Sequence, residues 1–533
     1  MSSSPKRLFK ILGIVVVTII VVISIGSFWL TNRIEERLNT VLRQAGLQVK
    51  KANISLLRRS VDLQVIKYIP ADSTQALPHK LSLQFLSIEG VHVLRFVRKH
   101  DLIIERIVLE EGVIAYNKNF KFKRDSTSCE KKSDITIDRL QIKNLIIKNI
   151  QGVMLDDTVQ ENAATIHDLQ VHNLIVYFKP DTSYTIGEVR ANLADLSSSA
   201  KGSLHTFSIS SVSYNSNDKQ IEAETFRITP KYNKSDFARI ARIQKTRLEI
   251  ELPKIILEGV ELEQFFSDST LRIKRITIPR PVIHAYRDKR YPFVRDWIMP
   301  LPIEGIRRLP FALNIDSILI YQADIAYEEF SEKGLPQPGT ITFNKLDASF
   351  AGLNTALKKP ARKDFCTLVA DCNVMNNGTL HATFKLPLNS QVNYQAFGNV
   401  RNMDLKSLNP SLGNLTRFEI SDGMLNELYF NFSYNDDVST GEVLINYKDL
   451  KLQALKKESK SHETNKILTA AINAIVKSDK DKSVDKSKRT GIIDIERDKK
   501  RFVFQLWWKS ILDGLQSTFL NSGKKKKTRK GSS

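Results

Sequence analysis

The stretch from Leu102 to Tyr116 reads LIIERIVLEEGVIAY, and its spacing decides the fold class. Its apolar residues step by two, then by three, then by two: Leu102, Ile104, Ile107 and Leu109. The segment ITIDRLQIKNLII repeats these steps at Ile135, Ile137, Leu140 and Ile142. The same spacing recurs at Leu81–Ile88, Ala164–Val171, Ile250–Leu257, Leu271–Ile278, Leu313–Ile320, Ile341–Ala348 and Ile445–Leu452.

A step of two keeps side chains on one face of a β-strand, and a step of three reverses the face unless the backbone corrects it. A β-bulge makes that correction and increases the twist of the strand. A two-residue hairpin also fits the spacing, but its turns favour Gly at the centre. The inserted pairs, such as Glu105-Arg106 and Lys274-Arg275, contain no Gly. We therefore expect bulged or kinked strands in a strongly twisted sheet.

Many strands with one apolar face need something to cover that face. A repetitive sheet can curl into a trough in which each unit touches its neighbours, and the inside of the trough is then a continuous apolar groove. Exposing one lipid chain of about 16 carbons to water costs about 12 kcal/mol, so such a groove suits lipid passage. The groove candidates are Leu102, Ile104, Ile107, Leu109, Ile135, Ile137, Leu140, Ile142, Leu271, Ile273, Ile276, Ile278, Leu313, Ile315, Ile318 and Ile320.

A membrane anchor is predicted at the start of the chain. Ile11 to Leu30 carries no charge, and a run of about 20 apolar residues spans a hydrocarbon core of about 30 Å. Lys6, Arg7 and Lys10 precede the run, which places the N-terminus in the cytoplasm and the body across the membrane. A cleaved signal peptide is the alternative, but no Ala-x-Ala site closes the run.

An amphipathic helix is predicted over residues 31–46. Asn32 and Glu35 have capping-box spacing, and Gly46 is placed to end the helix. Its apolar face consists of Ile34, Leu38, Val41, Leu42 and Ala45. This face lies on the membrane or closes the first end of the sheet, and the sequence leaves both alternatives open.

The body divides at a proline-rich segment. Residues 287–310 hold four prolines, and proline removes ladder donors, so we expect a connector there between a first groove region, 47–286, and a second, 311–455. The body is mainly β, a long, twisted, groove-like repetitive antiparallel sheet with a few short amphipathic helices.

The basic tail covers residues 456–533. The chain has 533 residues and a net charge of +22, and the tail holds 21 basic and 9 acidic residues. An apolar island, Ile467 to Val476, predicts a short helix, and a second apolar face includes Leu512 and Phe519. The candidates for contact with an anionic membrane surface are Trp507, Trp508, Ile511, Leu515, Lys524, Lys525, Lys526 and Lys527. The alternative is that this helix packs on the open end of the groove. Because the body is only mildly basic, we do not expect a nucleic-acid partner.

The sequence predicts no catalytic residue, no metal and no cofactor. It contains no His-Glu-x-x-His, Cys-x-x-Cys, P-loop or Gly-rich dinucleotide motif. We interpret His167 and His172 as partly exposed strand residues, and the pair Glu328-Glu329 as a solvated loop. Three cysteines are too few for a disulfide framework. We expect free thiols, with a Cys366–Cys372 disulfide as the alternative in an oxidising compartment.

Several segments resemble the AsmA-like family. They are LNTVLRQAGLQVKKANISLLRRSVDLQVI after the anchor, the repeated LSIEGVHV and LQIKNLII strands, GNVRNMDLKSLNPSL with ISDGMLNELYFNFSYNDDVSTGEVLINYKDLKLQAL, and the tail ILTAAINAIVKS to FVFQLWWKSILDGLQSTF. The resemblance runs from Lys6 to Phe519 and rests on the order of degenerate motifs. It implies an inner-membrane anchor, a periplasmic body in a Gram-negative envelope, and kinship with TamB-like and bridge-like lipid-transfer proteins.

We therefore expect a non-enzymatic protein that binds or moves phospholipid between envelope membranes. A second possibility is a structural or chaperone-like factor for outer-membrane protein assembly, which the resemblance also implies. The third is an enzyme acting on envelope glycans or lipids. A groove lined by the apolar positions above favours the first possibility. A sealed core with exposed sheet edges favours the second, and a convergent polar pocket favours the third.

Overall fold

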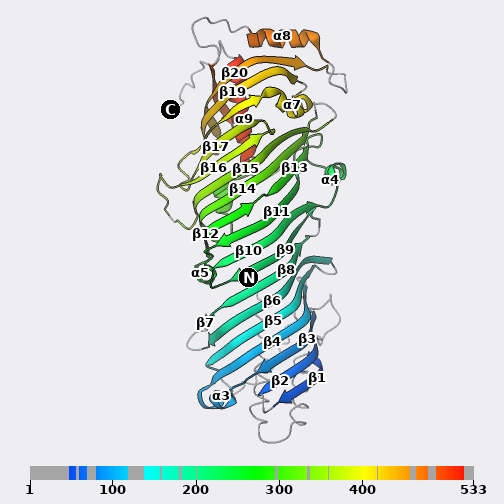
Figure 1. Ribbon diagram of the computed structural model, residues 1–533, viewed down its shortest axis with the longest axis vertical. Helices are drawn as coiled ribbons and strands as arrows, with labels where there is room; N and C mark the ends of the chain where they lie inside the picture. Colours follow the sequence, from blue (N-terminus) through cyan, green and yellow to red (C-terminus); the bar gives the residue numbers. More distant parts are fainter. Residues whose placement is uncertain are drawn as a thin grey trace. The chain divides into compact units, whose positions relative to one another are not determined.

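The computed structural model describes residues 42, 47–55, 59–68, 80–117, 137–156, 159–178, 183–200, 202–294, 298–332, 337–357, 359–416, 418–456, 464–477 and 488–520. Its strands belong to one 21-stranded, mostly antiparallel sheet (Figure 1), which confirms the prediction of a mainly β protein with few helices. The chain divides into two compact units, Met1–Thr225 and Phe226–Ser533. We describe each unit by itself.

The first unit is built from long strands and one short helix. Its elements are β1 (Leu47–Ser55), β2 (Ser60–Tyr68), β3 (Lys80–Glu89), α3 (Val93–Lys99), β4 (Asp101–Asn117), β5 (Arg139–Asp156), β6 (Val159–Tyr177), β7 (Ser183–Thr185), β8 (Val189–Ser198) and β9 (His205–Asn215). Strands β1 to β6 pair in chain order, β8 pairs with β6, and β9 pairs with β8. Strand β10 (Gln220–Pro230) crosses the boundary between the units.

The second unit continues with strands and more helices. Its elements are α4 (Lys234–Ala241), β11 (Arg247–Glu258), α5 (Leu262–Asp268), β12 (Thr270–Pro279), β13 (Val282–Asp288), α6 (Pro302–Ile306), β14 (Ala312–Phe330), β15 (Gly339–Asn354), β16 (Phe365–Val374), β17 (Gly378–Pro387), β18 (Tyr394–Asp404), η1 (Leu405–Leu408), α7 (Asn409–Thr416), β19 (Phe418–Tyr434), β20 (Val438–Ala454), α8 (Lys466–Lys477), β21 (Lys488–Glu496) and α9 (Val503–Leu520). The proline-rich connector lies inside this unit, between β13 and β14, and it contains α6.

Each unit contains a pair of parallel neighbours with an unbroken register. In the first unit β4 runs parallel to β5, with Leu102 opposite Leu140. In the second unit β12 and β13 together run parallel to β14, with Ile276 opposite Ile318. In both cases the apolar residues of one strand lie opposite those of its neighbour, because both strands carry the same 2-3-2 spacing and pair with a constant offset.

The expected kinks are present inside these strands. Glu111 of β4 and Asn149 of β5 have left-handed backbones, with φ of 51° and 52°, and the flanking pairs place them opposite each other. Arg280, between β12 and β13, and Gln322 of β14 do the same in the second unit, with φ of 50° and 52°. In each unit, therefore, the two parallel neighbours bend together at the same register.

The place of the left-handed residue differs from our expectation. The inserted pair Glu105-Arg106 has no left-handed residue, and the β4–β5 register is unchanged across it. Ile104 and Ile107 nevertheless belong to the same buried cluster, so the step of three does return the chain to one face. The left-handed residue comes at the next step of three, at Glu111. Register shifts of the kind a bulge produces occur instead between β14 and β15, after Ile320.

The two units share an internal duplication. Glu89-Gly90-Val91 precedes α3, and Glu258-Gly259-Val260 precedes α5 at the same offset. Gly90 and Gly259 both have left-handed backbones, with φ of 68° and 67°. The helices end at the left-handed residues His100 and Ser269. A kinked strand and its parallel partner follow each helix, so each unit holds one copy of the same strand–turn–helix–strand motif.

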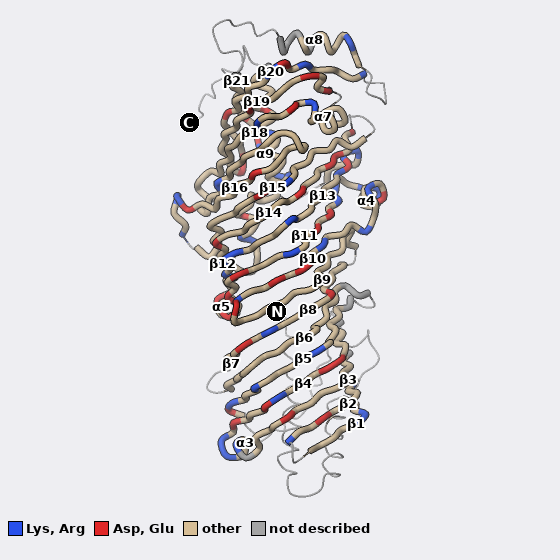
Figure 2. The backbone as a smooth tube through the Cα atoms, viewed as in Figure 1, with Lys and Arg blue, Asp and Glu red and all other residues tan. Residues whose placement is uncertain are grey.

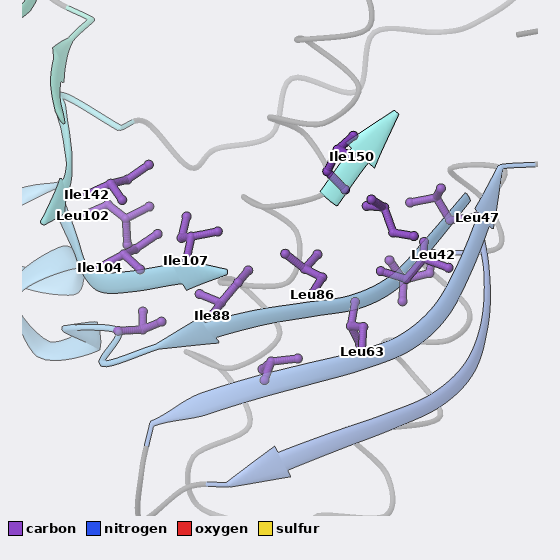
Figure 3. Packing of buried hydrophobic residues seen from close by; sticks show 14 of the residues in the cluster. Leu42, Leu47, Leu63, Leu86, Ile88, Leu102, Ile104, Ile107, Ile142 and Ile150 are labelled. Atoms are coloured by element: carbon purple, nitrogen blue, oxygen red, sulfur yellow. The ribbon is translucent and has the colours of Figure 1, made fainter. Parts of the chain in front are cut away.

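The core of the first unit gathers where β1 to β5 meet α3 (Figure 3). The cluster consists of Leu42, Leu47, Val61, Leu63, Ile66, Leu83, Leu86, Ile88, Val91, Phe96, Leu102, Ile104, Ile107, Ile142 and Ile150. Leu42 belongs to the predicted helix over residues 31–46, and its side chain is 2% exposed. The rest of the predicted helix lies outside the described residues.

In the second unit, α9 covers the sheet over β17 to β21. Trp507 stacks on Phe384 at 4.1 Å between ring centroids. Ser510 and Ser439 form a buried hydrogen bond of 2.7 Å. Gly514 lies so close to Val443 that a Cβ there would collide with its side chain. The helix therefore seals this part of the apolar face.

The helices also close the edge of the sheet at β20 and β21. The amide of Asn473 in α8 bonds both backbone groups of Leu452, at 2.9 and 2.6 Å. Thr469 accepts the backbone N–H of Ala454 at 2.9 Å. Ser517 and Asp513 of α9 accept the backbone N–H groups of Ile492 and Asp494, at 2.6 and 3.0 Å. These side chains take the place of a further strand, which protects the edge from pairing with another chain.

Two sequence predictions concern the anchor and the cysteines. The predicted anchor, Ile11 to Leu30, lies outside the described residues, and within the described part of the chain no helix is long and apolar enough to cross a membrane. Cys366 and Cys372 are free and buried on the same strand, β16. Six residues of strand span about 20 Å, which is far beyond disulfide reach, so the alternative of a Cys366–Cys372 bond is wrong.

Candidate functional site

An apolar face extends over β11 to β15 of the second unit. The register aligns Ile250 with Ile283, Ile276 with Ile318, and Phe350 with Ile318 across neighbouring strands. We define the unit-2 apolar face by these aligned side chains: Leu248, Ile250, Leu257, Leu271, Ile273, Ile276, Ile278, Ile283, Leu313, Ile315, Ile318, Ile320, Ala323, Ile325, Ile341, Phe343, Leu346, Ala348, Phe350 and Leu353.

Most of the unit-2 apolar face is only half-buried. Ile273, Ile315, Ala323 and Leu353 are at most 5% exposed, and the other members keep part of their surface in solvent. An ordinary sandwich would bury such a face under a second sheet. Here α9 covers the same side of the sheet farther along, over β17 to β21, while the side chains of β11 to β15 stay partly open.

The opposite face of these strands is polar. Arg275 pairs with Glu258 at 3.6 Å, and Lys234 pairs with Glu328 at 2.5 Å. Figure 2 shows basic and acidic residues interspersed along β11 to β14. Such exposed pairs contribute at most about 1 kcal/mol each. Their role is to keep this face in water, which leaves the apolar face as the side that needs a partner.

The first unit carries a similar apolar face, whose side chains are buried on β4 and become more exposed toward β8 and β9. The pairs Ile107–Leu145, Leu145–Val171 and Val171–Val189 carry it from β4 across β5 and β6 to β8. We define the unit-1 open face by its half-buried or exposed members on β6, β8 and β9: Ile166, Leu169, Val189, Ala191, Leu193, Leu196, Phe207, Ile209, Val212 and Tyr214. Phe207 is 43% exposed.

The sixteen groove candidates fall into two groups. In the first unit Leu102, Ile104, Ile107 and Ile142 are buried in the core cluster, and Leu109, Ile137 and Leu140 pack against it. Ile135 lies outside the described residues. All eight candidates of the second unit lie on the unit-2 apolar face: Leu271, Ile273, Ile276, Ile278, Leu313, Ile315, Ile318 and Ile320.

Sequence reasoning found the spacing of Ile166 and Leu169 on β6 but missed the members of the unit-1 open face on β8 and β9. The strands VRANLADLSS and HTFSISSVSYN mix apolar residues with Ser, Ala and Asn, which hides the alternation. A signal was present, because Leu193 and Leu196 are separated by a step of three that contains Asp195. Asp195 is left-handed, with φ of 52°, so β8 uses the same kink as β4 and β5.

The membrane-surface candidates on α9 differ in exposure, because one side of this helix packs on the sheet. Trp507, Ile511 and Leu515 are half-buried, and Trp507 packs against Phe384. Trp508 is 51% exposed. The four lysines Lys524 to Lys527 lie outside the described residues. For most of the helical candidates the contacts favour the alternative in which the helix packs on the sheet.

The polar side chains that the sequence singled out make local contacts. His167 is exposed on β6, and His172 lies 2.8 Å from the side chain of Asn144. Glu328 and Glu329 lie near the end of β14, not in a loop as we had interpreted them, and Glu329 accepts a hydrogen bond from Tyr327 at 2.7 Å. Burial and the nearby Glu329 carboxylate raise the pKa of Tyr327 above its ordinary value. Among the described residues, no group of three or more His, Cys, Asp or Glu is placed to hold a metal ion.

Comparison with known proteins finds neither a family model nor a curated protein that matches this chain. Any statement about function therefore rests on the geometry and on the resemblance of the sequence motifs.

Proposed function

We propose that this protein is a non-enzymatic, membrane-anchored β-groove protein that binds or transfers phospholipid by its acyl chains. The observation that carries the proposal is the unit-2 apolar face, whose aligned side chains are mostly half-buried. Each fully buried apolar side chain gains about 1.5–3 kcal/mol. Because the side chains of the unit-2 apolar face are only half-buried, a bound ligand can bury the rest of their surface and gain the remaining free energy.

The dimensions of this face match an acyl chain. Strands β11, β12, β14 and β15 are neighbours, and three strand spacings cover about 14 Å. One leaflet of a bilayer, half of an about 30 Å hydrocarbon core, is about 15 Å thick. An acyl chain laid across these strands would be covered along its length, while its headgroup remains in water at the rim.

The resemblance to AsmA-like proteins supplies the setting of this proposal. It favours an inner-membrane anchor at Ile11 to Leu30, a periplasmic body and a role in envelope biogenesis. An assembly factor that recruits strands would need an open sheet edge, and at β20 and β21 Asn473 and Ser517 occupy that edge. We therefore prefer lipid binding to the chaperone-like alternative.

The test is photocrosslinking combined with lipid analysis of the purified full chain. A photoreactive phenylalanine derivative replaces Ile318, on the unit-2 apolar face, or Tyr321, which is 45% exposed on the opposite face of the same strand. We expect phospholipid to co-purify and to crosslink at residue 318 and not at residue 321. Absence of lipid by mass spectrometry, or equal crosslinking at both positions, would contradict the proposal.

A further inference from the structure

The helix α3 and its duplicate α5 have the same fold and opposite charge. Helix α3 reads VLRFVRK and holds three basic and no acidic residues, whereas α5 reads LEQFFSD and holds two acidic and no basic residues. Figure 2 shows α3 in blue and α5 in red. The fold of the duplicated motif does not depend on these charges, since one copy forms with a basic helix and the other with an acidic helix.

The inward side of α3 is fixed by packing. Phe96 is 7% exposed in the core cluster, and Val93 packs against the same cluster. At 100° per residue, Arg95 and Arg98 then lie on the outward side, and Lys99 lies at the flank of the helix, where its side chain is exposed. The side chain of Val97 is 65% exposed beside them.

The outward side of α3 is accessible, and among the described residues its basic side chains have few acidic partners. Arg95 lies 3.4 Å from Asp101, a carboxylate that also has Arg139 at 3.9 Å. Arg98 and Lys99 are exposed in the last turn of the helix. Basic side chains around an exposed apolar side chain are typical of a surface that rests on anionic headgroups.

The position of α3 along the chain brings it close to a bilayer. Leu42 and Phe96 share the core cluster, and Leu42 follows the end of the predicted anchor at Leu30 by twelve residues. Twelve residues reach at most about 40 Å. Leu42, and with it the first unit, is therefore tethered within about 40 Å of the end of the predicted anchor.

We propose that α3 is a docking element that rests on the anionic surface of the membrane in which the chain is anchored, with Arg95, Arg98 and Lys99 against the headgroups and Val97 at the interface. This contact orients the first unit on the bilayer. The proposal rests on the predicted anchor and not on lipid binding by the apolar face, so either can fail without the other.

The test uses the full chain in nanodiscs of phosphatidylcholine alone or mixed with phosphatidylglycerol, each with a headgroup-quencher lipid. A fluorescent thiol label is placed by Val97→Cys in a Cys129→Ser background, where the two remaining thiols are buried. The comparison probe is Ser267→Cys on α5, at the exposed residue next to the position that corresponds to Val97. The charge variant is Arg98→Glu with Lys99→Glu, and its control is the exposed loop pair Arg362→Glu with Lys363→Glu.

We expect quenching of the label at residue 97 in the anionic discs and not in the neutral ones, and no quenching at residue 267. The double reversal on α3 should weaken the quenching about tenfold, and the control reversal should leave it unchanged. Quenching should also fall as salt rises from about 0.1 M to about 1 M, which shortens the Debye length from about 10 Å to about 3 Å.

Three results would overturn the proposal: no quenching at residue 97 in anionic discs, equal quenching at residues 97 and 267, or equal loss with both charge reversals. Failure of the chain to enter the discs would overturn it as well, because the tether is part of it. If the α3 reversal does not fold, the salt dependence of the label at residue 97 decides.

Discussion

Gly90, in the turn after β3, lies against Glu105 of β4, and a Cβ added at Gly90 would come within 2.6 Å of the Cβ of Glu105. Gly259 has the same relation to Lys274, whose Cβ lies 2.7 Å from the added Cβ. Real Cβ atoms essentially never approach so closely. Both glycines also have a left-handed backbone. The turn that begins each copy of the duplicated motif thus requires glycine for two reasons, the close contact and the left-handed backbone.

Replacing either glycine with alanine should destabilise the unit that contains it. The left-handed backbone costs about 1–2 kcal/mol with a Cβ, and the collision adds about 1–3 kcal/mol. We expect Gly90→Ala and Gly259→Ala each to lower the free energy of unfolding by about 2–5 kcal/mol, measured by urea denaturation of the full chain.

Gly202→Ala is the control for these two variants. Gly202 is left-handed as well, with φ of 77°, but a Cβ there would meet no atom within 4 Å. Its alanine variant should therefore show the backbone cost alone, about 1–2 kcal/mol. Equal losses at all three positions would mean that the close approach to Glu105 and Lys274 carries no energy.

The sequence predicted the fold class because the 2-3-2 spacing recurs in many strands, among them β4, β5, β12 and β14, and marks one apolar face in each. The eight groove candidates of the second unit lie on the unit-2 apolar face because β12 and β14 carry the 2-3-2 spacing with Leu and Ile residues. The sequence did not separate core from open surface, since Ile104 and Ile318 have the same local pattern. That difference depends on which elements pack above each residue, such as Phe96 of α3 above the first unit. The edge protection by Asn473 also left no periodic signal.

Aspartate substitutions should distinguish the closed core from the open face. Ile104 is 0% exposed, so Ile104→Asp buries a charge and should abolish folding of the first unit, at a cost above about 4 kcal/mol. Ile318 is half-buried, so Ile318→Asp should leave the fold intact and reduce phospholipid co-purification. Circular dichroism and lipid mass spectrometry of the two full-length variants provide the measurement. Unfolding of Ile318→Asp to the same extent would show that residue 318 is ordinary core.

The two adjacent tryptophans of α9 should differ in their effect on stability. Trp507 stacks on Phe384 and contacts Tyr434, so Trp507→Ala should cost about 3–5 kcal/mol. Trp508 is half exposed, and Trp508→Ala should change the free energy of unfolding by less than about 1 kcal/mol. Thermal and urea denaturation of the two variants test this difference, and each serves as the control for the other. A large loss from Trp508→Ala would indicate packing that its exposure does not predict.

The two buried thiols should be unreactive in the folded protein. Burial raises the pKa of Cys366 to about 12 and, together with the Asp371 carboxylate, that of Cys372 to about 11, from the ordinary 9.0. The thiolate is the reactive form, so a thiol reagent at pH 8 should label both cysteines only after unfolding. Rapid labelling of the native chain at these two positions would contradict their burial.

The same shifts predict a loss of stability in alkali. A thiol whose folded pKa is raised contributes stability below its unfolded pKa, and this contribution falls as the pH rises from about 9 through the folded values. The variant Cys366→Ala with Cys372→Ala is the control, because lysines and tyrosines titrate in the same range. The native chain should lose more stability between pH 9 and 11 than this variant, and equal losses would contradict the prediction.

The edge of the sheet should open when its side-chain cap is removed. The amide of Asn473 bonds both the N–H and the carbonyl of Leu452, and Asn473→Ala leaves both groups to water or to another chain. One hydrogen bond contributes about 1 kcal/mol, so amide exchange at Leu452 should accelerate about fivefold. Exposed backbone of an edge strand also templates pairing, so the variant should associate at concentrations where the native chain does not.

Lys466→Ala is the matched control for this prediction, because Lys466 is exposed in the same helix, α8. Hydrogen exchange read by mass spectrometry, together with light scattering, compares the two variants. Unchanged exchange at Leu452 in Asn473→Ala would mean that Thr469, which accepts the N–H of Ala454, suffices to hold α8 on the edge. Acceleration in both variants would instead show that α8 opens as a unit and that Asn473 does not hold it closed.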